Sequence, residues 1–450
     1  MSTAIERQKI QSEFSSRMDE DEMLNCMRCG FCLPSCPTYI TSGFKEEHSP
    51  RGRIALMKAV ADGLIEPDSD VERSLDLCLG CRACEPVCPS GVNYGHLLEE
   101  ARDIISQNKK YSLPVKAIRK TVFHGLFPYQ ERMTAAAGLL SLYQRTGLQT
   151  AVRKIGFMKL FPDSLAAMEK VLPAVPSYKD MKKRPEKLPA HGKPVKRAAF
   201  FSGCLMDTIF MGTNDATMKL LQMAGCEIVI PKSQACCGAL HGHSGEKEKA
   251  KELAKRNIAA FEDTGADYII TNAGGCGAFL VDYDHLLKDE PEWEIRAESF
   301  INKIKDISQI LFELDFHKNH KMALPHQILT YQDSCHLRNV MKTAAAPRIL
   351  LGSITGAEYR EMKDADRCCG SAGIYNIVES EMSMQILDYK MNQARTTEAA
   401  VIVTSNPGCL LQMKLGIERE GAAGHVKAVH IADLLLEAAE YAAAGAQTAR

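Results

Sequence analysis

The sequence predicts a multidomain protein of the α + α/β class, with an all-helical domain followed by two duplicated α/β modules. Three observations predict this fold: a run of four cysteines that occurs twice near the N-terminus, a Cys-Cys-Gly triplet that occurs twice in the second half, and short apolar segments that alternate there with helical patterns. The expected domains are 1–108 for the helical domain, 109–197 for a basic helical segment and a linker, 198–325 for the first Cys-Cys-Gly module and 326–450 for the second.

The repeated cysteine run has the pattern Cys-x2-Cys-x2-Cys-x3-Cys-Pro, and its copies end at Pro37 and Pro89. In a two-cluster ferredoxin, three closely spaced thiolates hold one 4Fe-4S cluster and the fourth cysteine of each run crosses to the other cluster. The sequence therefore predicts two 4Fe-4S clusters. The expected ligands are Cys26, Cys29, Cys32 and Cys88 for one cluster, and Cys78, Cys81, Cys84 and Cys36 for the other.

Structural zinc and disulfide bonds are the weaker interpretations of these eight cysteines. Zinc sites use two separated cysteine pairs rather than a run of four. The total of 17 cysteines is odd, and residues 1–21 are polar and charged where a secretory signal would be apolar. Cysteines that bind metal must stay reduced, which requires a reducing compartment, so we expect a cytoplasmic protein.

The 41 residues from Pro37 to Leu77, between the cysteines of the two runs, are expected to be helical. Ser49 can cap a helix whose first residue is Pro50. The apolar residues that follow recur on one helical face: Ile54, Met57, Val60, Ala61 and Leu64. Arg51 and Arg53 lie near this helix start, where they could dock a partner, sit near a cluster or form a solvated pair.

Residues 109–160 carry ten lysines and arginines against one acid, Glu131, among many leucines and aromatic residues. Such a segment suits an interfacial membrane anchor or an arm that docks a partner, and it equally suits helices packed against the first domain. The proline-rich stretch 171–197 is expected to be a linker. No stretch approaches the ~20 apolar residues of a membrane span, so a membrane contact would be peripheral, on the inner face of the cell membrane. The net charge of -1 gives no bias toward nucleic acid.

The second half of the sequence is expected to be a duplication. One unit consists of Cys204, Cys236-Cys237-Gly238 and Cys276, and the other of Cys335, Cys368-Cys369-Gly370 and Cys409. Equivalent cysteines are 131 to 133 residues apart, which chance does not explain. Each unit alternates strand and helix patterns: the expected strands are 198–201, 227–230, 268–271, 328–331 and 401–403, and the expected helices are 214–224, 247–263, 349–351 and 380–393.

Each unit is expected to form a small parallel sheet whose cysteines lie in loops past the strand ends, where such sheets bind ligands. The four thiolates of a unit could hold an iron-sulfur cluster or zinc, or they could be buried apolar cysteines. Cys226 has no equivalent in the second unit and is expected in the core. His241, His243 and His336 could be ligands, proton relays or binding groups, although a lone histidine is more often structural.

In this order of domains, the chain resembles the iron-sulfur subunits of bacterial glycolate oxidase over essentially its whole length. The strings that carry the resemblance are MRCGFCLPSCPTY, SPRGRI, CLGCRACEPVCPSGV, ACCGALH, NAGGCGAF, CCGSAG and NPGC. The modules are also similar to those of heterodisulfide reductases and lactate-utilisation proteins. In heterodisulfide reductases each module ends in a Cys-x2-Cys pair. This chain has Ala273 and Asn406 in place of the first cysteine of that pair.

The resemblance implies an electron-transfer subunit of a complex that oxidises glycolate and D-lactate, with no catalytic residue for that oxidation on this chain. FAD-containing partner subunits would supply the electrons, and the two clusters would pass them toward membrane quinone. No Gly-x-Gly-x-x-Gly follows an expected strand, so the flavin is expected on another subunit. The alternatives are a catalytic subunit of the heterodisulfide reductase type and a lactate-utilisation iron-sulfur protein.

Overall fold

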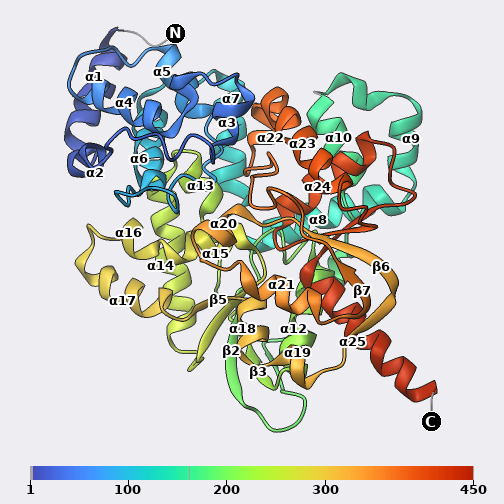
Figure 1. Cartoon of the computed structure of the whole chain (residues 1–450). Helices are drawn as coiled ribbons and strands as arrows, with labels where there is room; N and C mark the ends of the chain where they lie inside the picture. Colours follow the sequence, from blue (N-terminus) through green and yellow to red (C-terminus); the bar gives the residue numbers. More distant parts are fainter. Residues whose placement is uncertain (1–3, 162, 449–450) are drawn as a thin grey trace. The chain divides into compact units, whose positions relative to one another are not determined.

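The structure, a computed structural model, describes residues 4–161 and 163–448 (Figure 1). Its contacts divide the chain into two compact units. The first unit comprises 1–124, 238–250 and 367–387, and the second comprises 125–237, 251–366 and 388–450. This division differs from the domain boundaries expected from the sequence, because residues 238–250, which follow Cys236-Cys237, and residues 367–387, which include Cys368-Cys369, belong to the first unit.

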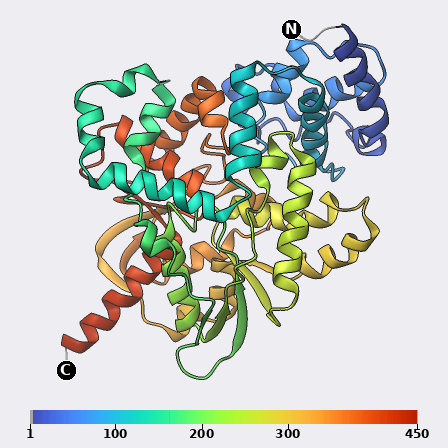
Figure 2. The same ribbon diagram turned by 180° about the vertical axis from the view of Figure 1, so that it is seen from behind.

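In its described residues the first unit is helical, as predicted for the N-terminal domain. Helices α1, α4 and α6 contact one another and lie side by side in both views (Figures 1 and 2). The helices of this unit are α1 (Ala4–Arg17), α2 (Glu20–Leu24), α3 (Pro37–Thr41), η1 (Glu46–His48), α4 (Pro50–Ala61), α5 (Ser69–Asp76), α6 (Tyr94–Asn108), α7 (Leu113–Arg119), α13 (Ala239–His243) and α22 (Tyr375–Val378).

The start of α4 confirms the predicted cap. Ser49 precedes the helix in extended conformation, its hydroxyl accepts a hydrogen bond from the Gly52 N–H, and Pro50 is the first helical residue. Buried side chains of α4 then pack with those of α1 and α6 in one core, which includes Phe14, Met57 and Ile104. This core lies directly beside the two cysteine runs.

Three helices cross from one unit to the other along the chain: η2 (Lys120–Leu126), α14 (Lys247–Glu262) and α23 (Ser380–Arg395). The first of these is a π-helix, a rare form that the sequence pattern does not signal. The remaining helices belong to the second unit. They are α8 (Gln130–Arg145), α9 (Leu148–Lys154), η3 (Phe157–Leu160), α10 (Asp163–Val171), α11 (Tyr178–Met181), α12 (Met211–Met223), α15 (Gly274–Val281), α16 (Tyr283–Leu286), α17 (Pro291–Ile301), α18 (Ile307–Glu313), α19 (Phe316–Asn319), α20 (Cys335–Asn339), α21 (Ala345–Gly352), α24 (Pro407–Arg419) and α25 (Ile431–Thr448).

The second unit contains a five-stranded sheet with the order β1-β3-β2-β4-β5 and a four-stranded sheet with the order β7-β6-β8-β9. All pairs are parallel except β1 with β3, so the prediction of parallel α/β sheets is confirmed. The strands are β1 (Lys187–Leu188), β2 (Lys196–Phe200), β3 (Cys226–Val229), β4 (Tyr268–Thr271), β5 (Ile304–Asp306), β6 (Ala323–Tyr331), β7 (Thr355–Tyr359), β8 (Val401–Thr404) and β9 (Lys427–His430).

The stretch 171–197 is more structured than the predicted linker. It contains α11 and β1, and its last two residues begin β2. Strand β1 pairs antiparallel with β3, with Leu188 opposite Ile228, and therefore covers the edge of the first sheet. A two-residue strand among prolines leaves no periodic pattern, so the sequence does not reveal it.

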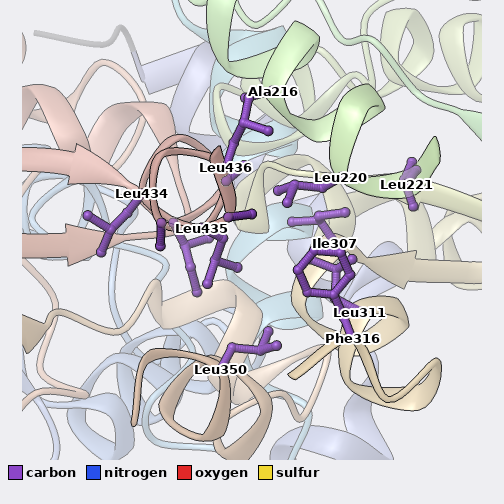
Figure 3. Close-up of a cluster of buried hydrophobic side chains, with 14 of the residues drawn as sticks. Ala216, Leu220, Leu221, Ile307, Leu311, Phe316, Leu350, Leu434, Leu435 and Leu436 are labelled. Carbon is purple, nitrogen blue, oxygen red and sulfur yellow. The ribbon is translucent and has the colours of Figure 1, made fainter. Parts of the chain in front are cut away.

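One hydrophobic core joins the two sheets. It takes side chains from β2 and β3 of the first sheet and from β6 and β8 of the second. Figure 3 shows the labelled side chains of α12, α18, α21 and α25 turned toward one another between these elements. Cys226 lies buried in β3 within this core, as predicted. The two α/β parts therefore fold as one packed body.

Candidate iron-sulfur sites

A small cavity in the first unit brings together cysteines from both runs. Cys36, which the sequence places in the first run, lines this cavity with three cysteines of the second run. The complete lining is Ser35, Cys36, Pro37, Thr38, Pro50, Arg53, Cys78, Leu79, Cys81, Arg82, Ala83, Cys84 and Tyr94. Cys36 therefore lies where the predicted crossing requires it, while the shared cluster stays a prediction. We name the cavity with Cys36, Cys78, Cys81 and Cys84 the Cys78 site.

Local structure positions the four thiols of the Cys78 site. Cys36 is the N-cap residue of α3, followed by Pro37 in the first helical turn. Cys78 follows the end of α5, and its sulfur accepts hydrogen bonds from the Gly80 N–H at 3.4 Å and the Tyr94 hydroxyl at 3.5 Å. All four cysteines are buried. Four thiols around a buried cavity with donors aimed at sulfur fit a 4Fe-4S cluster, which when bound supplies one-electron transfer.

The electrostatics of the Cys78 site favour anionic sulfur at one position. Burial opposes ionisation of Cys78, but the positive charges of Arg53 and Arg102 and the two hydrogen-bond donors hold its pKa below the usual range. Burial, followed by the neighbouring thiols of Cys81 and Cys78, instead raises the pKa of Cys84 well above its usual range. Because a metal cluster supplies the positive charge that such thiolates need, the donor set suits a cluster rather than four unliganded thiols.

The other predicted set, Cys26, Cys29, Cys32 and Cys88, is named the Cys26 site. Cys26, Cys32 and Cys88 are partly buried against the N-terminal core, whereas Cys29 is exposed. Burial raises the pKa of Cys32 to about 11, with smaller contributions from the Cys26 and Cys36 thiols. Three of the four predicted ligands therefore lie along the same core, and their common cluster stays a prediction.

The two cysteine loops share a backbone feature that their sequences hide. The third and fifth positions of each run have positive φ: Arg28 (55°) and Gly30 (89°) in the first run, and Gly80 (60°) and Arg82 (55°) in the second. Left-handed conformations are easy for glycine and costly for arginine. Glycine and arginine have exchanged places, yet both loops curl in the same way.

The first module brings its four predicted cysteines together. Cys204 follows β2, Cys236 and Cys237 follow β3, and Cys276 lies in the first turn of α15. The Cys236 thiol interacts with Cys204 and Cys237, and Cys237 interacts with Cys276. The hydrogen bond with Cys236, followed by burial, raises the pKa of Cys204 well above its usual range. The convergence at the carboxyl ends of the strands that topology predicts is present.

Two buried residues that sequence reasoning did not identify hold the Cys-Cys loop of the first module. The Asn257 side chain accepts from the Ala235 N–H at 2.7 Å and donates to the Cys236 carbonyl at 3.0 Å. The Tyr283 hydroxyl donates to the Cys237 carbonyl at 2.7 Å. Both residues lie in helices distant in sequence from the loop, so no local pattern marks them.

The cysteines of the second module are distributed over both compact units. Cys335, the first residue of α20, and Cys409, on α24, belong to the second unit, whereas Cys368 and Cys369 belong to the first. Their convergence on one metal stays a prediction. Asn406, the N-cap residue of α24, accepts from the Gly275 N–H at 3.0 Å, and its amide donates toward the Cys409 sulfur at 3.6 Å.

Two of the three candidate histidines, His241 and His243, lie in the first unit with structural surroundings. His241 is fully buried, its Nε2 lies 2.8 Å from the Phe123 carbonyl, and its ring packs edge to face with the Phe123 ring. His243 pairs with Glu99 at 2.7 Å. His336 lies on α20, near Gly275. The structural interpretation therefore fits His241 and His243.

All seventeen cysteines lie in the described residues, and none of them forms a disulfide. Among the same residues, no group of three or more His, Cys, Asp or Glu side chains is spaced for a single metal ion. In residues 4–161 and 163–448, no helix has both the length and the apolar character to span a bilayer.

Three family models match the chain. A "4Fe-4S dicluster domain" matches residues 22–92, which confirms the predicted two-cluster domain. A "Glycolate oxidase iron-sulfur subunit, linker region" matches residues 114–172. A "Cysteine-rich domain" matches twice, at residues 198–281 and 329–414. The order of the matches along the chain is the order that the sequence predicts.

Curated relatives match along most of the chain. The "Probable glycolate oxidase iron-sulfur subunit" of Bacillus subtilis (strain 168) is 70% identical over 98% of this chain and 99% of its own length. The "Glycolate oxidase iron-sulfur subunit" of Escherichia coli (strain K12) is 31% identical over 87% of this chain and 90% of its own length. The "Lactate utilization protein A" of Bacillus thuringiensis (strain Al Hakam) is 34% identical and covers 53% of this chain.

One solved structure is similar in fold. It is the "Crystal structure of a hypothetical protein from Helicobacter pylori", with a TM-score of 0.50 and 10% sequence identity. The similarity covers 94% of this chain and 73% of the other. At this identity the likeness concerns the fold alone.

Proposed function

This chain belongs to the family of glycolate oxidase iron-sulfur subunits, and on that premise we propose that it relays electrons from glycolate to membrane quinone. An FAD-containing partner subunit would oxidise glycolate, and D-lactate as a second substrate, and a reduced flavin holds two electrons. The two cluster sites would accept these electrons one at a time and pass them on. The observation that carries the proposal is the Cys78 site, where cysteines of two separate runs line one buried cavity.

The side chains of this chain would bind and insulate the clusters rather than act on glycolate. The Cys78 site is enclosed by buried residues of α4 and α6, which exclude water and leave sulfur as the ligand. Cys29 of the Cys26 site is exposed. We propose that electrons enter at the exposed Cys26 site, because electron transfer from a partner requires a cofactor close to the surface.

The two Cys-Cys-Gly modules are proposed to be copies of one ancestral module. Strand order supports this, since β3-β2-β4-β5 and β7-β6-β8-β9 are the same arrangement. The glycine of each triplet supports it too, because Gly238 and Gly370 both have φ of 89°. We further propose that Cys204, Cys236, Cys237 and Cys276 hold an iron-sulfur cluster rather than zinc, since adjacent cysteines reach different irons more easily than one tetrahedral ion.

We also propose that α8, α9 and η3 contact the surface of an anionic membrane. The segment 139–161 exposes Leu139, Leu142, Leu148, Ile155, Phe157, Leu160 and Phe161, and it contains no acidic residue. Arg145 and Lys154 are exposed in the same segment. Clustered apolar side chains with surrounding cations suit insertion at the level of anionic headgroups. We name these nine residues the apolar-basic surface.

The relay is tested by removing one ligand of the Cys26 site in the complete complex. We expect Cys29→Ser to reduce glycolate-dependent quinone reduction to background, because the cluster is lost or misligated, while glycolate still bleaches the flavin of the partner. The matched control is Cys226→Ala, which changes a buried core cysteine and is expected to keep both activities. Iron, acid-labile sulfide and zinc per polypeptide, measured in the same preparations, report cluster loss and identify the metal of the modules.

Quinone reduction at the wild-type rate in a Cys29→Ser complex that has lost iron would contradict the relay. Loss of flavin bleaching in the same variant would mean that the change has disturbed subunit assembly instead. Zinc with no iron beyond that of the two ferredoxin-type clusters would remove the proposed third cluster and leave the relay intact.

A further inference from the structure

Two arginines of α4, two residues apart in sequence, have different electrostatic surroundings. Arg51 lies near the surface, where its guanidinium pairs with the Glu46 carboxylate at 2.7 Å and donates to the Arg28 carbonyl at 2.9 Å. Arg53 is fully buried, and in the described part of the chain it forms no ion pair with a carboxylate. The charge of Arg51 is therefore balanced by a carboxylate and lies near solvent. The charge of Arg53 has no carboxylate partner among the described residues and is buried.

The guanidinium of Arg53 borders the Cys78 site. Its Nε donates to the Ser74 carbonyl at 2.7 Å and its Nη2 to the Thr38 hydroxyl at 3.1 Å, which fixes the group in place. Its Nη1 is buried and has no hydrogen-bond partner among the described residues. Arg53 also lines the cavity itself. An unused, buried donor of a charged group at a cavity wall indicates that the cavity holds an anionic group.

The groups that favour the charged form of Arg53 are mainly cysteine sulfurs. Burial opposes that charged form, but interactions with Cys78, then Tyr94 and then Cys36 hold the pKa of Arg53 above the usual range. The Sγ of Cys36 also lies 3.3 Å from the Thr38 hydroxyl that Arg53 contacts. The guanidinium therefore faces two predicted cluster ligands, one from each cysteine run.

We propose that Arg53 tunes the Cys78 site, because its fixed positive charge and its unused Nη1 donor make this site accept an electron more readily than the Cys26 site. The inference rests on the proposed relay and adds the order in which the two cluster sites receive an electron. One electron adds one negative charge, and no proton is taken up with it because the guanidinium is always protonated. A buried cation stabilises that added charge far more than one that is exposed and paired with a carboxylate.

An electron that enters at the Cys26 site would therefore pass to the Cys78 site, because the Cys78 site would have the higher reduction potential. Charge near a cluster and hydrogen bonds to its sulfurs are two of the factors that set reduction potentials in iron-sulfur proteins. The Gly80 N–H and the Tyr94 hydroxyl, which both donate to the Cys78 sulfur, act in the same direction as Arg53. Arg53 is a tuning residue in this scheme, since it holds neither metal nor substrate.

The test is a potentiometric titration of the complete, anaerobically purified chain, followed by EPR and visible absorbance. In the wild type the two ferredoxin-type clusters are expected to give two midpoint potentials, and the proposed cluster of the first module a third. Arg53→Gln keeps donors for Ser74 and Thr38 but removes the charge, and we expect it to lower the midpoint potential of one ferredoxin-type cluster and leave the others in place. Arg53→Lys keeps the charge and is expected to stay close to the wild type. Lys58→Gln, which removes a charge of α4 that pairs with Asp62 at 3.0 Å, is the matched control and is expected to shift neither potential.

Each outcome decides one question. An Arg53→Gln chain with full iron and sulfide and with unchanged potentials would overturn the role of Arg53. A loss of iron in both Arg53 variants would also overturn it, by making the residue necessary for assembly rather than for tuning. A wild-type chain without a 4Fe-4S signal would remove the relay itself, so failure of the proposed function is distinguishable from failure of this inference.

Discussion

The exchange of glycine and arginine between the two cysteine loops shows how little local sequence reveals of backbone conformation. Both loops require positive φ at their third and fifth positions, and each uses glycine at only one of them. Arg28 and Arg82 adopt the same region at a cost of about 1 kcal/mol or more for a residue with a Cβ. The two arginines keep this strained conformation because the loop needs it to turn the cysteine sulfurs inward.

A pair of substitutions in these loops should change the free energy of unfolding in opposite directions. Gly80→Ala adds a Cβ at φ of 60° and is expected to destabilise the first unit by about 1 kcal/mol, because the space around Gly80 is open and only backbone strain remains. Arg28→Gly relieves the same strain and is expected to be neutral or stabilising by up to about 1 kcal/mol. Thermal unfolding of the iron-loaded chain measures both. Equal destabilisation by the two changes would contradict the strain argument.

At the scale of elements, the sequence predicts well those segments whose stability is local. The bounds of β4 agree with the expected strand, and α14 ends within one residue of expectation. The prediction of a two-cluster domain from the cysteine runs is also confirmed, because ligand spacing is a local property. By contrast, β1, β5 and β9 have four residues or fewer, and they depend on pairing with strands distant in sequence. Asn257 and Tyr283 could not be predicted for the same reason.

Helix α18 begins with a capping box that should make stability depend on pH. Asp306 accepts from the Ser308 N–H at 2.8 Å, and Gln309 accepts from the Asp306 N–H at 2.7 Å. The other carboxylate oxygen of Asp306 is buried and has no hydrogen-bond partner among the described residues. Burial raises the pKa of Asp306 to about 6, despite these hydrogen bonds. The folded chain therefore holds this proton more tightly than the unfolded chain, whose aspartate pKa is about 3.9.

A raised acid pKa contributes stability below about pH 4, and that contribution is lost as the pH rises through about 6. From pH 5 to pH 7.5 we expect the wild type to lose about 1 kcal/mol from this residue, and we expect Asp306→Asn to lose none of it. The melting temperature of both chains across this range measures the difference. Exposed Asp289→Asn is the control and should keep the wild-type slope. Equal slopes for Asp306→Asn and the wild type would contradict the assignment.

At the scale of the whole molecule, one part of the chain has surface chemistry unlike the rest. The family model for the linker region spans residues 114–172, which include the apolar-basic surface. The sequence predicts this segment only as a choice between an anchor, a docking arm and a packed helix pair, because amphipathic periodicity does not tell which face is covered. Ile155 is 75% exposed and Leu160 is 78% exposed, so these side chains are not packed against the rest of this chain.

The membrane proposal predicts reversible binding of the chain to anionic vesicles. We expect the wild type to float with vesicles of phosphatidylcholine containing phosphatidylglycerol, and to do so less with phosphatidylcholine alone, since Arg145 and Lys154 interact with anionic headgroups. The double change Ile155→Ser and Leu160→Ser should weaken binding by about 2 kcal/mol, roughly thirtyfold, because two apolar side chains no longer enter the interface.

The chain offers a matched control for this experiment in Ile295. Its side chain is 73% exposed, close to the value for Ile155, but it lies on α17 beside Glu292 and Glu294. Ile295→Ser should therefore leave vesicle binding unchanged, because the acidic neighbours keep that face away from anionic lipid. If the double variant floats as the wild type does but no longer associates with the flavoprotein, the apolar-basic surface binds the partner subunit, and the chain reaches the membrane by another route.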